Sequence, residues 1–271
     1  MQERHSDRER YFKEQNLVTE KYVIPYIRRA LQITPQMTVA EIGCGEAGNL
    51  KPFLDMGCKV YGIDIATHKI ENAKRFYENH PQKQNLNLIA ADIYKVQPED
   101  IDKLDLIIMR DTIEHIPNQE LFLGNLKKFL KPNGKIFFAF PPWRMPFGGH
   151  QQICMSKVLS NLPYFHILPE SLYILILKLF GETKDKIKGL LEIRQTRISI
   201  NRFHRILVKN NLSIIYQDYY LINPNYEIKF KLKVRKLPPM LNVPHFRDFF
   251  TTTCYCIVGV DNNCKERKIN V

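Results

Sequence analysis

The sequence predicts an α/β fold in which helices cover both faces of a mainly parallel sheet. Strand-like and helix-like patterns alternate between residues 38 and 140, which is typical of such a sheet. A glycine-rich segment, EIGCGEAGNL at residues 41–50, joins the first strand to a helix, and the alternation stops after Phe140. With 271 residues and 44% hydrophobic content, the chain is long enough for one large domain with an insertion.

The elements are predicted in a regular order. Residues 17–33 read as helical pieces that Pro25 interrupts. The five strands expected next are residues 37–43, 59–65, 86–93, 103–110 and 135–140. The helices between them are expected at residues 49–57, 66–80 and 118–134, the last of which Pro132 and Gly134 end.

The pattern after residue 140 predicts an insertion and then a return to the sheet. Residues 141–198 are rich in proline and aromatic residues and contain one apolar segment, residues 171–181. We expect them to form a cap over the carboxyl ends of the strands, where open α/β sheets bind ligands. A helix at 200–211 and strands at 212–222 and 249–260 should complete the domain, while residues 228–236 read as a strand with one solvated face. The predicted units are therefore 1–140, the cap at 141–198, and 199–271.

Composition favours a cytoplasmic protein with an anionic or apolar partner. The charged start of the chain lacks the apolar core of a secretion signal, and the apolar segment is shorter than the ~20 residues of a spanning helix. Six dispersed cysteines show no paired metal-site spacing, so we expect reduced thiols. The formal charge of +12 suits nucleic acid, a membrane surface or an acidic small molecule.

The glycine-rich segment admits two ligands. Gly43, Gly45 and Gly48 match the G-x-G-x-x-G pattern of a dinucleotide pyrophosphate loop. Read from Glu41, the same residues spell acid-x-Gly-x-Gly, and Asp64 could accept from ribose hydroxyls in either case. A carboxylate at position 41 would repel a pyrophosphate by roughly 4 kcal/mol at ~4 Å and an effective dielectric of 20. Glu41 therefore favours a cationic ligand such as S-adenosylmethionine.

Acidic residues follow four of the predicted strands, which supports a ligand site at that edge of the sheet. They are Glu41, Asp64, Asp92 and Asp111. Asp92 is placed to accept from an adenine amino group while Ile93 packs on the ring. Arg110 and Asp111 interrupt an apolar strand where it reaches the expected cleft.

Taken together, VAEIGCGEAGNL, VYGIDIATHKIENAK, AADI, LDLIIMRDTIEHIPN and LKPNGKIFFAFPP resemble a class I S-adenosylmethionine-dependent methyltransferase. The resemblance implies a Rossmann-like, seven-stranded, mostly parallel sheet whose last strand is antiparallel. It also implies S-adenosylmethionine as cofactor, and contacts with its methionine end, ribose and adenine, and sulfonium side. The methionine end would contact Gly43, Cys44 and Gly45. The ribose and adenine would contact Asp64 and Ile65, and the adenine also Asp92 and Ile93. Arg110 would form the wall beneath the sulfonium. The sequence departs from the family at Ala47, where many members have a third glycine.

The acceptor is expected to be a hydrophobic or anionic small molecule that is methylated on a hydroxyl oxygen. His115 is the candidate base, although it could equally cap a helix or pack beneath the cofactor, and His150 is a second catalytic candidate. The EHIP segment is similar to that of quinone-type O-methyltransferases, where the Glu and His also invite a divalent metal. Glu114 and His115 alone offer too few ligands to predict one here. Two glycines in PFGGHQQ predict a lid hinge. Substrate contacts are expected from the cap residues Trp143, Arg144, Gln151 and Tyr164.

Other partners and functions stay open. The apolar cap segment could pack the cap, form a homodimer seam or contact a membrane peripherally. A nucleic-acid methyltransferase, with RNA as acceptor, is disfavoured because FPPW has Phe140 where the amine-methylating tetrad has a side-chain acceptor. A non-catalytic cofactor-binding partner protein is the remaining alternative.

Overall fold

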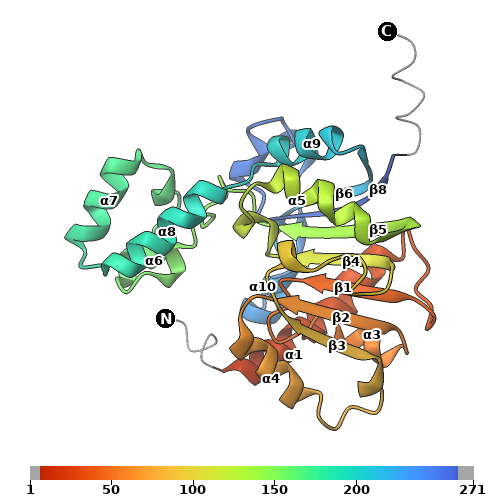
Figure 1. Cartoon of the computed structure of the whole chain (residues 1–271). Coiled ribbons are helices and arrows are strands. Elements are labelled where there is room, and N and C mark those ends of the chain that lie inside the picture. Colours follow the sequence, from red (N-terminus) through yellow and green to blue (C-terminus); the bar gives the residue numbers. More distant parts are fainter. Residues whose placement is uncertain (1–6, 262–271) are drawn as a thin grey trace, which may run out of the picture.

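One mixed sheet forms the centre of the molecule (Figure 1). The structure, a computed structural model, describes residues 7–261. Its strand order is β3-β2-β1-β4-β5-β8-β6-β7. The strands are β1 Thr38–Ile42, β2 Lys59–Asp64, β3 Leu86–Ala90, β4 Leu104–Arg110, β5 Leu130–Phe140, β6 Leu212–Ile222, β7 Arg235–Lys236 and β8 Thr253–Val260.

The predicted Rossmann-like topology is confirmed, with a correction to the strand count. Strands β1 to β5 pair in parallel, and β8 runs antiparallel between β5 and β6. The sheet has eight strands rather than seven because the two-residue β7 pairs with the outer edge of β6. Residues 228–236, expected as one strand, instead contribute to the end of α10 (Pro224–Phe230), a connection and β7. Asn223 begins that helix by accepting from the Asn225 amide.

Two layers of helices cover the sheet. On one face lie α1 (Arg8–Val18), α2 (Ile24–Ile27), α3 (Lys51–Asp55) and α4 (Thr67–Phe76), whose apolar side chains join one buried cluster. A π-helical turn, Thr19–Val23, joins α1 to α2 immediately before Pro25. On the other face, α5 (Gln119–Leu126) and α9 (Ile200–Lys209) pack against a second cluster.

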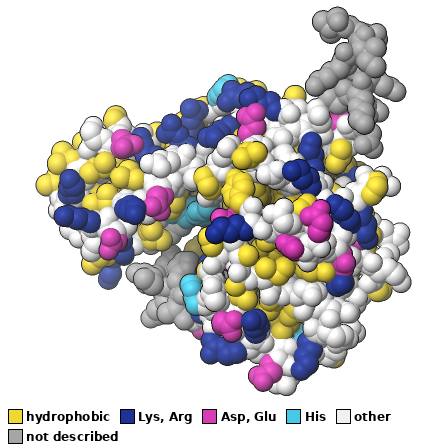
Figure 2. All heavy atoms as spheres, in the orientation of Figure 1, with side chains coloured by type: hydrophobic (Ala, Val, Ile, Leu, Met, Phe, Trp, Pro, Cys, Tyr) yellow, Lys and Arg dark blue, Asp and Glu magenta, His cyan; other side chains and the backbone are white. Residues whose placement is uncertain are grey.

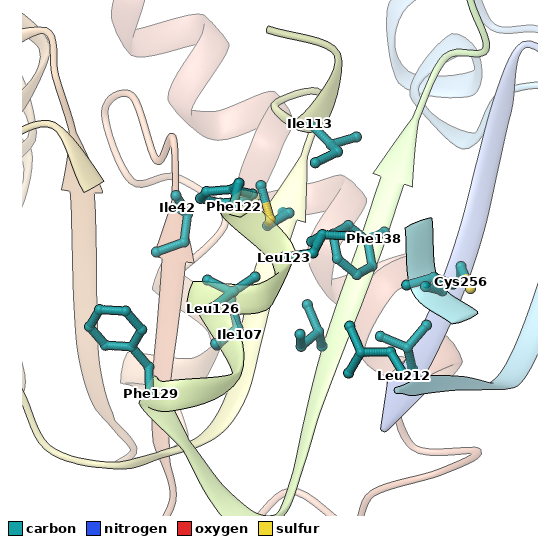
Figure 3. Close-up of a cluster of buried hydrophobic side chains, with 14 of the residues drawn as sticks. Ile42, Ile107, Ile113, Phe122, Leu123, Leu126, Phe129, Phe138, Leu212 and Cys256 are labelled. Atoms are coloured by element: carbon teal, nitrogen blue, oxygen red, sulfur yellow. The ribbon is translucent and has the colours of Figure 1, made fainter. Parts of the chain in front are cut away.

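Alternation along the strands fills both clusters. In β4, Ile107 and Met109 face the α5–α9 cluster, while Leu106 and Ile108 face the opposite one. Figure 3 shows Ile107 and Phe138 beneath the α5 side chains. Burial of both faces is why these central strands read as continuous apolar runs.

The insertion forms a small helical lobe beside the sheet (Figure 1). It contains α6 (Lys157–Asn161), α7 (Glu170–Leu179) and α8 (Lys184–Thr196). The lobe has an apolar cluster of its own, which includes Phe165, Tyr173 and Leu177. Its two ends meet where the Trp143 amide donates to the Ile198 carbonyl at 2.8 Å.

Within residues 7–261, no helix is long and apolar enough to cross a membrane. The five cysteines in that part of the chain are buried and unpaired, and Cys264 lies outside the described residues.

Replacing Phe138 with Ala should lower the free energy of unfolding by about 3–5 kcal/mol, because it empties a fully buried position. Its ring contacts Phe203 edge-on, with centroids 5.0 Å apart. Urea denaturation monitored by circular dichroism measures the change. The matched control is Val208→Ala on α9, where the side chain is 74% exposed and the expected loss is below about 0.5 kcal/mol. Equal losses in the two variants would contradict this assignment of the core.

Candidate functional site

The glycine-rich loop after β1 is held in a left-handed conformation and tied to β2. Gly43 and Gly45 have φ of 73° and 56°. The Gly43 and Cys44 amides donate to the Ile63 carbonyl at 2.8 and 3.2 Å. A Cβ on Gly43 would lie 2.6 Å from the Thr112 side chain, so only glycine lets the end of β4 approach.

The third glycine of the literal dinucleotide pattern has a packing role here. A Cβ on Gly48 would lie 2.6 Å from the Phe12 carbonyl oxygen of α1. The nearby left-handed position belongs to Ala47, with φ 61°, whose carbonyl accepts from the Tyr77 hydroxyl at 2.7 Å. Gly48 therefore makes room for α1, and the turn closes at a non-glycine residue, which explains the departure seen in the sequence.

Asp64, at the end of β2, organises the next part of the site. It is 9% exposed and accepts from the Gly45 and Ala66 amides, each at 2.8 Å. The following Ile65 is 72% exposed, although it is apolar and adjoins the loop. Asp92 accepts from the Tyr94 amide at 3.0 Å, and Ile93 packs partly into the α5–α9 cluster.

A buried polar network links β1 to β4. Glu41 is 1% exposed and accepts from the Asn49 side-chain amide at 2.5 Å. The Asn49 oxygen in turn accepts from Arg110, which also donates to Thr19 at 3.1 Å and to Asn225 at 2.7 Å. Burial raises the pKa of Glu41 to about 8, although Asn49 and Arg110 act in the opposite direction. Glu41 thus lies behind the cleft and is hydrogen-bonded to Asn49, which lines it.

The cleft itself lies at the carboxyl ends of β1 and β4. Four of the sequence-predicted residues line it, namely Gly43, Gly45, Arg110 and Asp111. Asp111 has φ 49°, and its amide donates to the Ala139 carbonyl at 2.8 Å. Two helices far apart in sequence, α1 and α10, supply the opposite wall. The wall residues that sequence analysis missed are Arg8, Tyr11, Glu14, Gln15, Val18, Asn225, Ile228 and Lys229.

An ion pair fixes the α1 wall to the glycine loop. Glu46 is fully buried and bonds to Arg8 through both of its carboxylate oxygens, one of them 2.6 Å from Arg8 Nε. Burial raises the pKa of the neighbouring Tyr11 to about 12, so its hydroxyl stays protonated. No local pattern in the sequence signals this wall, because α1 and α10 meet the loop only after the chain folds.

Two histidines meet at the rim between the sheet and the cap. His115 follows β4 in a 3₁₀ turn, Ile113–His115, and its ring centroid is 4.9 Å from that of His150. Burial lowers the pKa of both, that of His150 to about 3, so both rings are neutral near pH 7. Glu114 lies beneath them, and burial raises its pKa well above the usual range.

The predicted substrate residues of the cap differ in accessibility. Arg144 is exposed over the Phe249 ring, and the half-exposed Tyr164 donates its hydroxyl to the Phe249 carbonyl. Trp143 is 9% exposed, and its carbonyl accepts from His166 Nε2 at 2.7 Å. Gln151 is fully buried, and its amide donates to the backbone of Pro146 and Leu162, which is an internal structural role.

The two glycines of the expected hinge are closely packed. A Cβ on Gly148 would lie 2.2 Å from the Trp143 carbonyl oxygen, and one on Gly149 would lie 2.2 Å from His166 Cβ. Neither glycine has a positive φ. Close packing, rather than flexibility, explains both residues.

Comparison with known proteins identifies the segment that carries the glycine loop. Residues 40–138 match the family model described as "Methyltransferase domain". Phosphoethanolamine N-methyltransferase 2 of Caenorhabditis elegans is 32% identical over 115 residues, which is 42% of this chain and 26% of that protein. Ubiquinone biosynthesis O-methyltransferase of Coxiella burnetii is 30% identical over 103 residues, 37% of this chain and 42% of that protein. The matches thus span less than half of these relatives.

Solved structures share the fold at low identity. A candidate sarcosine dimethylglycine methyltransferase from Galdieria sulphuraria superposes with a TM-score of 0.59 at 12% identity, covering 90% of this chain and 86% of that one. Geranyl diphosphate C-methyltransferase from Streptomyces coelicolor A3(2) gives 0.53 at 14% identity, covering 88% and 79%.

The raised pKa of Glu41 makes a testable difference to stability. The folded protein binds this proton more tightly than the unfolded chain, whose carboxyl has a pKa near 4.5. The resulting stabilisation is complete below pH 4.5 and is lost as pH rises through about 8. Stability of Glu41→Gln relative to the original protein should therefore rise with pH across this window, by at most about 1.4 kcal/mol per pH unit.

Denaturant titrations at a series of pH values measure that relative stability. Glu78→Gln, in the exposed turn that follows α4, serves as the control and should show a flat difference. A flat difference for Glu41→Gln as well would contradict the burial of an ionisable Glu41.

Proposed function

We propose, from the membership of residues 40–138 in the class I S-adenosylmethionine-dependent methyltransferase family, that this protein transfers a methyl group from S-adenosylmethionine to a small-molecule acceptor. The methyl group would move by in-line displacement to a hydroxyl oxygen. A hydrophobic or anionic acceptor and a cytoplasmic location complete the proposal.

The mixed charge of the cleft is the observation that carries the proposal. Three acids, Glu14, Glu46 and Asp111, line it together with four bases, which are Arg8, Lys69, Arg110 and Lys229. The methionine end of S-adenosylmethionine is itself mixed, with an ammonium, a sulfonium and a carboxylate. A dinucleotide pyrophosphate carries only negative charge, so it could pair with the bases but would offer no cation to Asp111. The cleft therefore fits the methyl donor better than a dinucleotide.

The other predicted donor contacts fit this pose. Asp64 would accept from the ribose hydroxyls, as it now accepts from two loop amides. Ile65 and Ile93 would pack against the adenine, and Asp92 would accept from its amino group. The exposed face of Ile65 would then be covered by the ligand. Cys44, buried behind the loop, would contribute backbone rather than thiol.

The two histidines support proton removal from a hydroxyl acceptor. Because both rings are neutral near pH 7, His115 can accept the hydroxyl proton while the oxygen–methyl bond forms and the sulfur–methyl bond breaks. His150 would assist from the cap. Arg144 and Tyr164 contact Phe249 at the junction of the cap and the C-terminal segment, whereas Trp143 contacts His166 within the cap. All three would contact the acceptor.

Two alternatives have less support. An amine-methylating nucleic-acid enzyme needs a side-chain acceptor where this chain has Phe140, which is fully buried in the apolar core. A non-catalytic cofactor-binding protein would have no need for the paired histidines at the rim. RNA as acceptor is therefore not part of the proposal.

The outer face of the cap supports peripheral contact with a membrane. Leu172, Leu175 and Leu179 recur at helical spacing on α7 and are 42%, 52% and 74% exposed. Figure 2 shows hydrophobic side chains across the cap with lysine and arginine among them. The exposed cap lysines are Lys157, Lys178, Lys184 and Lys188. This combination of apolar and basic side chains suits an anionic lipid surface.

Titration calorimetry tests the donor. We expect S-adenosylmethionine and its demethylated product to bind and NAD not to bind. Asp64→Ala should weaken binding at least about 10-fold, because it removes charge-assisted hydrogen bonds of roughly 1.5–3 kcal/mol each. Glu71→Ala, an exposed acid on α4 that pairs with Lys74, is the control and should bind normally. Tight NAD binding would overturn the proposal.

Vesicle sedimentation tests the membrane contact. The protein should pellet with vesicles rich in phosphatidylserine more than with neutral vesicles, and Leu175→Glu with Leu179→Glu should abolish the difference. The control, Val208→Glu, places the same charge on an exposed apolar position of α9 outside the cap. A concentration-dependent dimer that the cap substitutions disrupt, without any vesicle binding, would show instead that this face is a homodimer seam.

A further inference from the structure

Three side chains that can ligate a metal converge where the cap meets the sheet. Glu114 and His115 belong to the turn after β4, whereas His150 belongs to the cap. Each offers one ligand atom, and these atoms lie within 4.8 Å of one another. Among residues 7–261, this is the one such group of histidine, cysteine, aspartate and glutamate side chains.

The Glu114 carboxylate lacks the partners that a buried charge requires. It is 4% exposed, and neither of its oxygens has a hydrogen-bond partner at ordinary geometry among the described residues. Burying a carboxylate without compensation is costly, and cations or hydrogen-bond donors normally offset that cost. Near it, His150 Nδ1 is also buried without a partner. Unpartnered atoms thus occur on two of the three side chains of this group.

We propose that Glu114, His115 and His150 bind a divalent transition-metal ion, for which Zn²⁺ is the best fit. Two imidazoles and one carboxylate form a nitrogen-rich ligand set, which suits Zn²⁺ better than Mg²⁺ or Ca²⁺, both of which prefer oxygen ligands. Three protein ligands leave one tetrahedral position open, as in catalytic zinc sites. The ligand atoms, which now lie within 4.8 Å of one another, would draw closer to reach zinc–ligand distances of about 2.0–2.2 Å.

The ion would connect the cap to the strand end. His150 has a left-handed backbone, with φ 54°, which turns its ring toward His115. Packing of the two preceding glycines against Trp143 and His166 fixes the chain that leads to it. The ion would therefore hold the cap in one position relative to the sheet.

The open position also suggests a use, and this step rests on the proposed methyl transfer. An acceptor hydroxyl bound there would lose its proton more readily, because a metal ion lowers the pKa of a bound oxygen. With the ion bound, the histidines would hold it and the acceptor proton would pass to solvent. Without the ion, His115 would accept that proton as proposed above.

Zinc titration of the metal-stripped, untagged full chain tests the site without donor or acceptor. We expect one equivalent of Zn²⁺ to bind and to raise the melting temperature. His150→Gln and Glu114→Gln should each weaken binding more than about 10-fold, since even the loss of a ligand's supporting partner costs that much. The matched controls are His68→Gln on α4 and Glu120→Gln on α5, both exposed. These controls should bind as the original protein does.

The metal-free stability of Glu114→Gln separates a metal site from a structural carboxylate. The variant should unfold at about the same denaturant concentration as the original protein, because it replaces a buried carboxyl group that lacks hydrogen-bond partners with an amide of the same shape. Absence of zinc binding, or equal affinity in His150→Gln and His68→Gln, would overturn the proposal. Failure to bind S-adenosylmethionine would leave this zinc result unaffected, so the two proposals can fail separately.

Discussion

The buried guanidinium of Arg110 is the constraint on which the cleft depends. A buried cation is tolerated only when its donors are all occupied, and here the partners come from three separate segments of the chain. Thr19 follows α1, Asn49 belongs to the glycine loop and Asn225 begins α10. The same cation, together with the hydrogen bond from Asn49, favours the ionised form of the buried Glu41. One charged side chain at the end of β4 thus positions both walls of the cleft.

Much of the sheet could be predicted from sequence because its signals are local. Alternation in β4 and apolar runs in β5 report burial directly, and glycine at position 43 reports a required φ. The edge strand β7 lies within the strand expected at residues 228–236, but only the last two residues of that range pair with β6. Likewise, residues 228–230 alternate in polarity, yet capping by Asn223 draws them into α10.

The site residues that could be predicted are those in the glycine-rich segment and at the carboxyl ends of the parallel strands. Asp64 and the loop glycines lie together because the carboxyl ends of parallel strands meet at one edge. Tyr11, Asn225 and the pairing of His150 with His115 depend on contacts between distant segments, for which a single sequence has no signal. The glycines before His150 looked like a hinge because sequence cannot distinguish a glycine needed for flexibility from one needed for close packing.

The single hydrogen bond between Trp143 and Ile198 has a consequence for how such proteins diversify. The chain leaves the sheet and returns to it at almost the same point, so the intervening segment closes as a loop whatever its length. Loop-closure entropy grows only slowly with length, by about 0.6 kcal/mol per doubling. The cap also has its own apolar cluster. A different lobe could therefore be exchanged at this neck while the donor cleft stays intact, which separates the choice of acceptor from the chemistry of the sheet.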